Sequence, residues 1–335
     1  MVEGTAFETR QGRKSLGGSN PPLSANKMLQ NKKIIITAGE TFNDIDVLAC
    51  AIAYKELLEL EGKVAEVVLP GPLNNSITTT VKSWPIKFLT TPSTSNFDCV
   101  IVDISEPEYL ARFATLESIV EIYDHHFGFE KFWQERLGEK SHIESIGACA
   151  TLIWEQFKKR GLAEKISQLS ANLLYTAILS NTLNFGAKIT NNRDIEAFAE
   201  LQKYINLPKN WQEIYFQEVE DGLNGNVKEV LINDTKTKVL PGINQKVQIG
   251  QLEIWRADKF LAENIIKIFE TFKTFNNPCW FLNLVSIAES KNYIITDNSE
   301  VQKILAKYLN ITFTDNIGTT DRLWLRKEII KKIYQ

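Results

Sequence analysis

Ser118-Ile119-Val120-Glu121-Ile122-Tyr123-Asp124-His125-His126 joins an apolar run directly to a cluster of ionisable side chains. The run predicts a buried strand over 118–123, which places the three polar residues at its end. They include two of the only three histidines in a chain of 335 residues. A carboxylate beside two imidazoles indicates a metal site, although Asp and His at a strand end also serve as ordinary turn residues.

Two earlier apolar runs also end in acids. Residues 33–37 lead to Asp44 and Asp46 at the start of an expected helix that runs to about residue 62, and residues 97–102 end at Asp103. In an open parallel sheet, ligands bind beyond the carboxyl ends of the strands. Six side chains are therefore expected to converge, as a site for two metal ions requires: Asp44, Asp46, Asp103, Asp124, His125 and His126.

The order of the predicted elements indicates two domains. Strand-like and helix-like segments alternate up to about residue 185, which predicts an α/β doubly wound parallel sheet. A polar break at 187–193 precedes a smaller α+β domain, with strands expected at 227–232, 247–254, 280–286 and 293–296. A helix is also expected over 108–116.

The first residues differ in composition from the rest. Residues 1–27 are polar and rich in Gly, Ser and Pro, and they lack the apolar core of a signal peptide. We expect them to form a disordered lead, with translation of the native protein beginning at Met28.

Composition limits the partners and the compartment. A net charge of -3 gives no reason to expect long nucleic acid as a partner, and no run approaches the roughly 20 apolar residues of a membrane span. The four cysteines are widely spaced and lie mostly in apolar runs, which is typical of buried thiols in a cytoplasmic protein: Cys50, Cys99, Cys149 and Cys279.

Taken together, the order and spacing of these motifs resemble the DHH phosphoesterase superfamily, in particular its manganese-dependent family II inorganic pyrophosphatases and the related exopolyphosphatases. The resemblance runs from about residue 31 to the C-terminus. It is carried by seven segments: Gly39 to Asp46, Val102-Asp103, Asp124-His125-His126, 144–151, 174–182, 249–253 and Arg326-Lys327.

The resemblance implies a catalytic domain over 28–187, a linker at 188–194, a substrate-binding domain over 195–335 and an active site in the cleft between the domains. It implies two Mn²⁺ or Mg²⁺ ions bridged by Asp103. Asp44 would bind one ion, and Asp46 together with His125 the other. It also suggests a homodimer formed through the first domain.

The resemblance assigns further roles around the metals. His126 would donate a proton or contact phosphate, and Asp124 would orient its neighbours. Arg326 and Lys327 would clamp the distal phosphate of a small phosphorylated substrate, although a lone Arg-Lys pair is usually a solvated surface.

Three positions depart from the pattern of the pyrophosphatases. Glu40 stands where they have a histidine ligand, Asn181 where they have an aspartate ligand, and Phe127 where an arginine usually follows the double histidine. Glu40 and Asn181 are still expected among the metal ligands, in a site that has fewer imidazoles and therefore prefers Mg²⁺ or Mn²⁺.

These departures leave three functions open. The leading hypothesis is a hydrolase that cleaves a small phosphoanhydride, inorganic pyrophosphate first, by metal-activated water. The second is an exopolyphosphatase-like enzyme, because that branch also lacks the first-motif histidine. The third is a catalytically impaired homologue that binds phosphate or metal.

Overall fold

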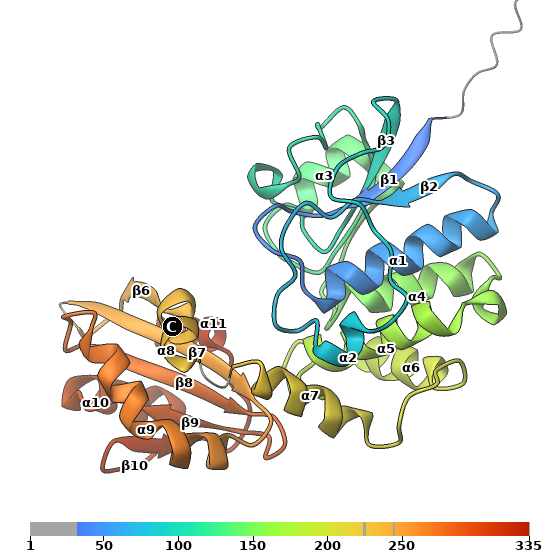
Figure 1. The fold of residues 1–335 in the computed structure, drawn as a ribbon. Coiled ribbons are helices and arrows are strands. Elements are labelled where there is room, and N and C mark those ends of the chain that lie inside the picture. The colour runs from blue at the N-terminus through green and yellow to red at the C-terminus, as the bar shows by residue number, and fades with distance from the viewer. Residues whose placement is uncertain (1–31, 224–225, 244, 335) are drawn as a thin grey trace, which may run out of the picture. The chain divides into compact units, whose positions relative to one another are not determined.

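The computed structural model describes residues 32–223, 226–243 and 245–334 (Figure 1). The expected disordered lead over 1–27 and the start at Met28 lie outside the described residues and stay predictions. Residues Lys33–Gln335 pack as one compact unit that contains two β-sheets. No helix among the described residues is long and apolar enough to cross a membrane.

The first sheet is fully parallel, with strand order β2-β1-β3-β4-β5. The order reverses between β1 and β3, so the loops that leave these two strands diverge and open a crevice at their carboxyl ends. The strands are β1 Lys33–Thr37, β2 Ala65–Val67, β3 Phe97–Val102, β4 Ile119–Asp124 and β5 Ser141–Ile143.

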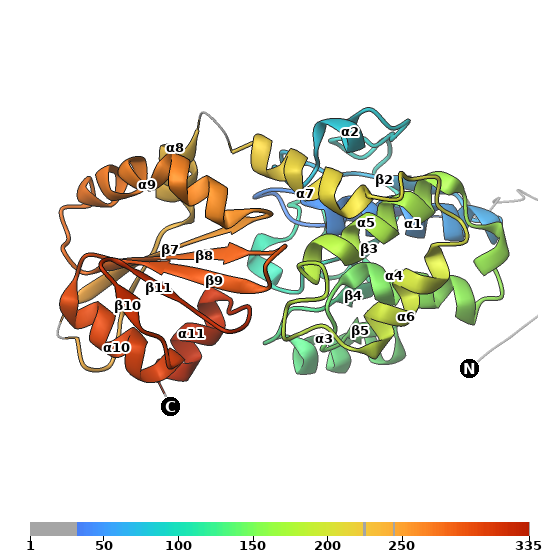
Figure 2. The same ribbon diagram turned by 90° about the horizontal axis from the view of Figure 1, so that it is seen from below.

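Seven helices accompany this sheet among the described residues. They are α1 Ile45–Leu60, α2 Thr79–Lys82, α3 Glu130–Leu137, α4 Cys149–Lys159, α5 Gln168–Asn181, α6 Asn192–Leu201 and α7 Trp211–Asp221. Figure 2 shows α1 and α5 on one side of the sheet and α3 on the other. Because both faces are covered, alternate strand residues enter different cores: Ile36 and Val100 pack with α1 and α5, whereas Ile35 and Ile101 pack with Trp133 of α3.

The second sheet is mixed, with strand order β10-β11-β9-β8-β7-β6 and only β7 and β8 parallel. Helices α8 and α9 pack on one face of this sheet, and α10 and α11 pack on the other (Figure 2). The elements are α8 Val227–Asp234, β6 Lys236–Val239, β7 Lys246–Ile254, α9 Ala257–Lys273, β8 Trp280–Ser286, β9 Lys291–Ile295, α10 Ser299–Leu309, β10 Phe313–Thr314, β11 Ile317–Thr319 and α11 Arg326–Ile333.

The α/β doubly wound sheet followed by a second, α+β sheet confirms the predicted fold class. Two segments were predicted wrongly. Residues 227–232 form α8 instead of a strand, because Val227 and Leu231 are spaced one helical turn apart and pack on α9. Residues 108–116 form only a short 3₁₀ turn at Pro107–Tyr109, because the backbone of Leu110 bridges to Gly39 beside β1.

The predicted linker at 188–194 overlaps the start of α6 at Asn192. Ala197 of α6 and Tyr215 of α7 are buried in the same core as α1 and α5. We propose that the boundary between the two domains lies after α7, later in the chain than the predicted linker at 188–194.

A buried carboxylate on β4 is held by both hydroxyl and basic groups. Glu121 accepts hydrogen bonds from the hydroxyls of Tyr54 at 2.6 Å and Tyr123 at 2.9 Å. Burial raises the pKa of Glu121, but the surrounding donors and charges outweigh burial and lower it from 4.5 to about 2. Three basic side chains lie 3.4 to 4.0 Å from its carboxylate: Lys140, His142 and Arg160.

We expect this carboxylate to make stability depend on pH. The folded pKa of Glu121 lies below its unfolded value, so its contribution is complete above about pH 4.5 and is lost as the pH falls toward 2. Glu121→Gln should lower the free energy of unfolding by about 3 kcal/mol at pH 7 and by about half as much at pH 3. Urea unfolding at both pH values measures this. Glu117→Gln, at a side chain that is 82% exposed, is the control and should change little; an equal loss at both pH values for Glu121→Gln would contradict the assignment.

Candidate metal centre

Three loops bring acids and imidazoles to the carboxyl ends of β1, β3 and β4. Asp44 caps α1 by accepting hydrogen bonds from the backbone N–H groups of Asp46 and Val47, both at 3.0 Å. Asp103 follows β3 directly, and His125 follows β4. These residues therefore lie at the carboxyl ends of neighbouring strands, at the reversal of strand order.

Asp103, His125 and His126 form the tightest group of potential ligands. One ligand atom from each lies within 4.8 Å of the others. His125 Nε2 is 3.3 Å from Asp103 Oδ1, while His125 Nδ1 is 3.1 Å from the carbonyl of Ile146. A carbonyl can only accept, so Nδ1 carries the proton and the lone pair on Nε2 faces Asp103.

Three carboxylates repel one another at this edge of the sheet: Asp46 and Asp103 are buried, and Asp44 is partly exposed. Burial raises the pKa of Asp44, and burial together with the charge of Asp44 raises the pKa of Asp46 to about 7. Burial and the charges of Asp46 and Asp44 raise the pKa of Asp103 well above its ordinary value. Such a group is costly in the protein alone and becomes favourable around divalent cations.

Unsatisfied oxygens support the same conclusion. Asp103 Oδ1 and Asp124 Oδ2 are buried and have no hydrogen-bond partner. Buried polar atoms in native proteins normally have partners, so an orphan carboxylate oxygen facing His125 fits a metal ligand. The donor set of carboxylates with imidazole suits Mn²⁺ or Mg²⁺.

Local backbone geometry fixes two of the acids. Asp103 has a φ of 58°, a left-handed conformation that Asp tolerates better than most residues, and this turns the chain sharply at the end of β3. Asp46 accepts hydrogen bonds from the N–H groups of Cys149 and Ala150 at the start of α4, both at 2.8 Å. The amino end of α4 thereby holds Asp46 in place.

The loop before α4 is itself closely packed. A Cβ atom on Gly147 would lie 2.6 Å from Asp194 Oδ2 and 2.8 Å from a methyl carbon of Thr182. Fully buried Asp194 accepts hydrogen bonds from the N–H of Gly147 at 2.9 Å and the hydroxyl of Thr151 at 2.7 Å. Sequence reasoning missed Asp194, whose only signal was an acid three residues after the helix-capping Asn191.

Asp124 and His126 form a hydrogen-bonded pair. Asp124 is fully buried, and its Oδ1 accepts from His126 Nδ1 at 2.8 Å and from the backbone N–H of His125 at 2.7 Å. Burial lowers the pKa of His126, but the hydrogen bond and charge of Asp124 outweigh burial and raise it. The His126 side chain is 57% exposed, so it can exchange a proton with a bound substrate.

The convergent ends line a pocket of about 280 Å³, called the site pocket below. Its lining includes Asp44, His125, His126, Asn181, Glu253 and Lys327. Asn181 lines this pocket, and its amide donates to the carbonyl of Ala177 at 3.3 Å. Glu253 was not predicted as a site residue, although it belongs to the segment 249–253 that carries the resemblance.

Two predicted site residues are engaged elsewhere, and both expectations need correction. Glu40 accepts from the N–H of Arg112 at 2.8 Å and pairs with its guanidinium at 3.1 Å, so its carboxylate is not among the groups that converge. The guanidinium of Arg326 donates hydrogen bonds to both carboxylate oxygens of Asp234, at 2.6 and 3.1 Å, and to the carbonyl of Ile249. Both terminal nitrogens of its guanidinium are therefore engaged by Asp234 and Ile249, whereas Lys327 lines the site pocket.

Removing one acid should uncouple stability from metal binding. With Mn²⁺ at 100 times its dissociation constant, the native protein should gain about 2.7 kcal/mol of stability over its EDTA-treated form. Asp103→Asn removes one of the repelling charges, so we expect the EDTA-treated variant to unfold at the same or a higher temperature than the native protein, with the Mn²⁺ gain lost. Thermal unfolding with and without Mn²⁺ measures both effects. Asp321→Asn, at an exposed position, should retain the full gain; a full gain in Asp103→Asn would refute the metal centre.

Comparison with known proteins gives a consistent result. No protein-family model matches the chain. The manganese-dependent inorganic pyrophosphatase of Bacillus subtilis (strain 168) is 23% identical over 306 residues, covering 88% of this chain and 95% of that protein. A probable manganese-dependent inorganic pyrophosphatase of Bacillus mycoides (strain KBAB4) is 23% identical over 301 residues, covering 88% and 96%.

Solved structures show the same fold. A Methanococcus jannaschii protein provisionally assigned as a family II inorganic pyrophosphatase superposes with a TM-score of 0.59 at 18% identity, over 90% of this chain and 100% of that chain. An exopolyphosphatase-related protein from Bacteroides fragilis gives 0.50 at 15% identity, over 91% of each chain. The chain is thus related over most of its length to manganese-dependent inorganic pyrophosphatases and has the fold of the family II enzymes.

Proposed function

We propose that this protein is a metal-dependent phosphohydrolase that cleaves a small phosphoanhydride, with inorganic pyrophosphate as the first candidate. The observation that carries the proposal is the group of Asp44, Asp46 and Asp103 beside His125, whose mutual repulsion divalent cations would relieve. The named activity of the relatives over most of the chain supports it.

We propose the following metal ligands. Asp44, Asp103 and His125 would hold two Mn²⁺ or Mg²⁺ ions, with Asp46 supporting them from the start of α4. When bound, such a pair supplies a water that is deprotonated at neutral pH and neutralises the oxygens of the reacting phosphate.

The remaining residues act on the substrate. His126, whose pKa is raised by the hydrogen bond and charge of Asp124, would donate a proton to the leaving phosphate oxygen. Lys327 presents an ammonium group to the site pocket and would hold the distal phosphate.

An impaired homologue is the second candidate, and two observations favour it. Asn181 supplies a neutral amide in the site pocket, and Glu40 pairs with Arg112 instead of the acids. The protein would then have fewer residues that coordinate the second ion directly than an active pyrophosphatase requires. It would still bind metal through Asp103 and His125.

Phosphate release from pyrophosphate, with Mn²⁺ and with Mg²⁺, tests the proposal. We expect metal-dependent release that falls at least about 100-fold in His126→Gln, because that variant loses the proton donor. Release that is undetectable in the native protein and restored by Asn181→Asp would identify the impaired homologue. No release from either protein, with metal binding retained, would overturn the proposed hydrolase.

Substitutions at two adjacent basic residues should have different effects, one on catalysis and the other on stability. Lys327→Ala should lower kcat/KM for pyrophosphate at least about tenfold, because one charge-assisted phosphate contact is lost, and should leave the free energy of unfolding within about 0.5 kcal/mol. Arg326→Ala should lower the free energy of unfolding by roughly 1 to 3 kcal/mol, because Asp234 loses its bidentate partner. Urea unfolding and steady-state kinetics on both variants measure this, and the reverse pattern would refute the roles.

The compartment and the number of copies stay predictions. The four cysteines are free and buried, as expected, which fits a cytoplasmic protein. We propose a homodimer through the first sheet on the resemblance alone, and sedimentation equilibrium would decide it.

A further inference from the structure

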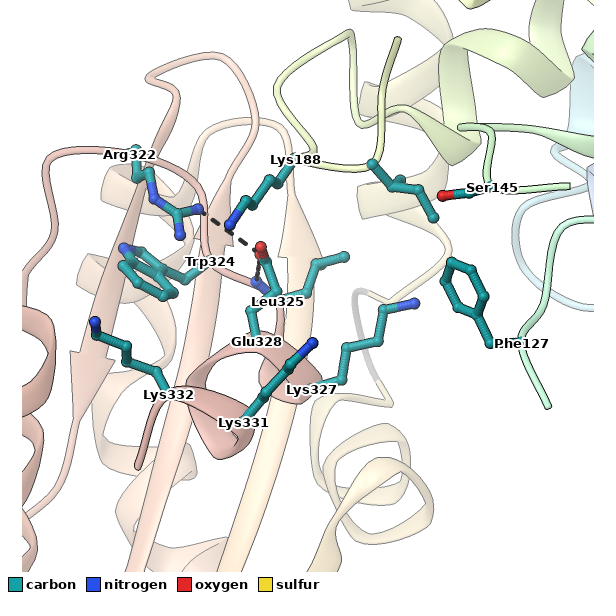
Figure 3. Close-up of a pocket in the computed structure, with 11 residues that line it drawn as sticks. Phe127, Ser145, Lys188, Arg322, Trp324, Leu325, Lys327, Glu328, Lys331 and Lys332 are labelled. Atoms are coloured by element: carbon teal, nitrogen blue, oxygen red, sulfur yellow. Dashed lines mark hydrogen bonds and ion pairs between the residues drawn. The ribbon is translucent and has the colours of Figure 1, made fainter. Parts of the chain in front are cut away.

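An uncharged polar side chain in the lining of the site pocket has no role in the proposed function. Asn74 lines this pocket together with Asp44, His125 and His126, and it lies in the loop between β2 and α2. Among the lining residues that the structure describes, Lys327 is the only lysine or arginine. Figure 3 shows Lys327 at the start of α11, among the residues of an adjoining pocket. A phosphate ligand with several anionic oxygens would therefore need uncharged donors as well.

The amide of Asn74 is held in one orientation by Ser76. The backbone N–H of Ser76 donates to Asn74 Oδ1 at 2.9 Å, and the hydroxyl of Ser76 donates to the same oxygen at 2.6 Å. Because a backbone N–H can only donate, the amide atom that faces it is the oxygen and not the nitrogen. The hydroxyl of Ser76 accepts from the backbone N–H of Ile45 at 2.8 Å, which leaves its own proton for Asn74.

Further hydrogen bonds hold this loop against the segments that carry the acids. The hydroxyl of fully buried Tyr215 donates to the carbonyl of Ser76 at 2.9 Å. The backbone N–H of Asn74 donates to the carbonyl of Asn43 at 2.9 Å. Asn43 is itself fully buried and directly precedes Asp44. A side chain that is fixed in this way loses little conformational entropy when a ligand binds to it.

These contacts leave the amide nitrogen of Asn74 as an unused donor. Among the described residues, no acceptor forms a hydrogen bond with Asn74 Nδ2, whereas Oδ1 already accepts from two donors. An amide binds a metal ion through its oxygen, and in Asn74 that oxygen faces Ser76. The free N–H bonds are therefore suited to an acceptor that comes from outside the protein, such as a phosphate oxygen.

We propose that Asn74 is a substrate-binding residue, which donates a hydrogen bond from Nδ2 to a non-bridging oxygen of the phosphate group held at the acids. The inference rests on the proposed function and adds a residue to its site. A neutral donor suits this position, because a lysine beside Asp44, Asp46 and Asp103 would pair with the acids and compete with the metal ions. An amide binds the anion without that competition.

Two substitutions distinguish a substrate contact from a structural role. Asn74→Asp keeps an acceptor for both Ser76 donors but replaces the free N–H donor by an anionic oxygen, whereas Asn74→Ala removes acceptor and donor together. With Mn²⁺, we expect kcat/KM for pyrophosphate to fall at least about tenfold in Asn74→Ala and at least about tenfold further in Asn74→Asp, because the new carboxylate repels the phosphate. If Asn74 only supported its loop, the order of the two variants would be reversed. Steady-state kinetics measures this order.

The matched control places the same charge one position along the loop. Asn75 is exposed, so Asn75→Asp should keep kcat/KM within about twofold of the native value. The gain in thermal stability from Mn²⁺ should be unchanged in Asn74→Ala, because Asn74 contacts the anion and not the metal ions. Native activity in Asn74→Asp, an equal loss in Asn75→Asp, or loss of the Mn²⁺ gain in Asn74→Ala would each overturn the proposal.

Binding of imidodiphosphate, in which nitrogen replaces the bridging oxygen, separates this inference from the proposed function. With Mn²⁺ present, we expect isothermal titration to give the highest affinity for the native protein, a lower one for Asn74→Ala and the lowest for Asn74→Asp. If this order holds but pyrophosphate is not cleaved, the hydrolase is refuted and Asn74 stands as an anion-binding residue. Cleavage of pyrophosphate with equal affinities in the three proteins would refute the role of Asn74 and leave the hydrolase standing. Absence of binding by the native protein would also overturn the inference.

Discussion

Mutual repulsion among Asp44, Asp46 and Asp103 is the constraint on which the rest of this structure depends. Burial raises the pKa of all three carboxylates, and repulsion adds to this for Asp46 and Asp103, so ionising them together is costly without a compensating cation. The fold keeps them together through backbone groups: two N–H groups in the first turn of α1, the N–H groups at the start of α4, and the left-handed turn after β3. Folding thus holds the three carboxylates in place before any cation binds, and their arrangement becomes favourable once cations are bound.

The first sheet was predictable because its strands are covered on both faces. Continuous apolar runs such as 97–102 have few alternatives to a buried parallel strand, and the acid that ends each run then lies at one edge. This reasoning located Asp103 and His125 correctly. It failed at 227–232, where β-branched residues suggested a strand and packing on α9 selected a helix.

The direction of a charged side chain was much harder to predict than its position. Arg326 and Lys327 are adjacent in sequence, yet one binds Asp234 and the other faces the site pocket. Glu40 lies close to Asp44 in sequence but pairs with Arg112. In each case the deciding partner is far away along the chain, so no local pattern could reveal it, and only the folded arrangement of the loops does.

The tight contact at Gly147 has a consequence for how this protein can diverge. Residue 147 has no space for a Cβ atom because Asp194 and Thr182 occupy it, and Asp194 also holds the loop that delivers the α4 amides to Asp46. A side chain at 147 could be accommodated only if 194 became smaller, yet a smaller residue there would release the loop. Gly147 and Asp194, which are distant in sequence, are therefore expected to be retained or replaced together. Relatives that retain the metal centre should keep both residues.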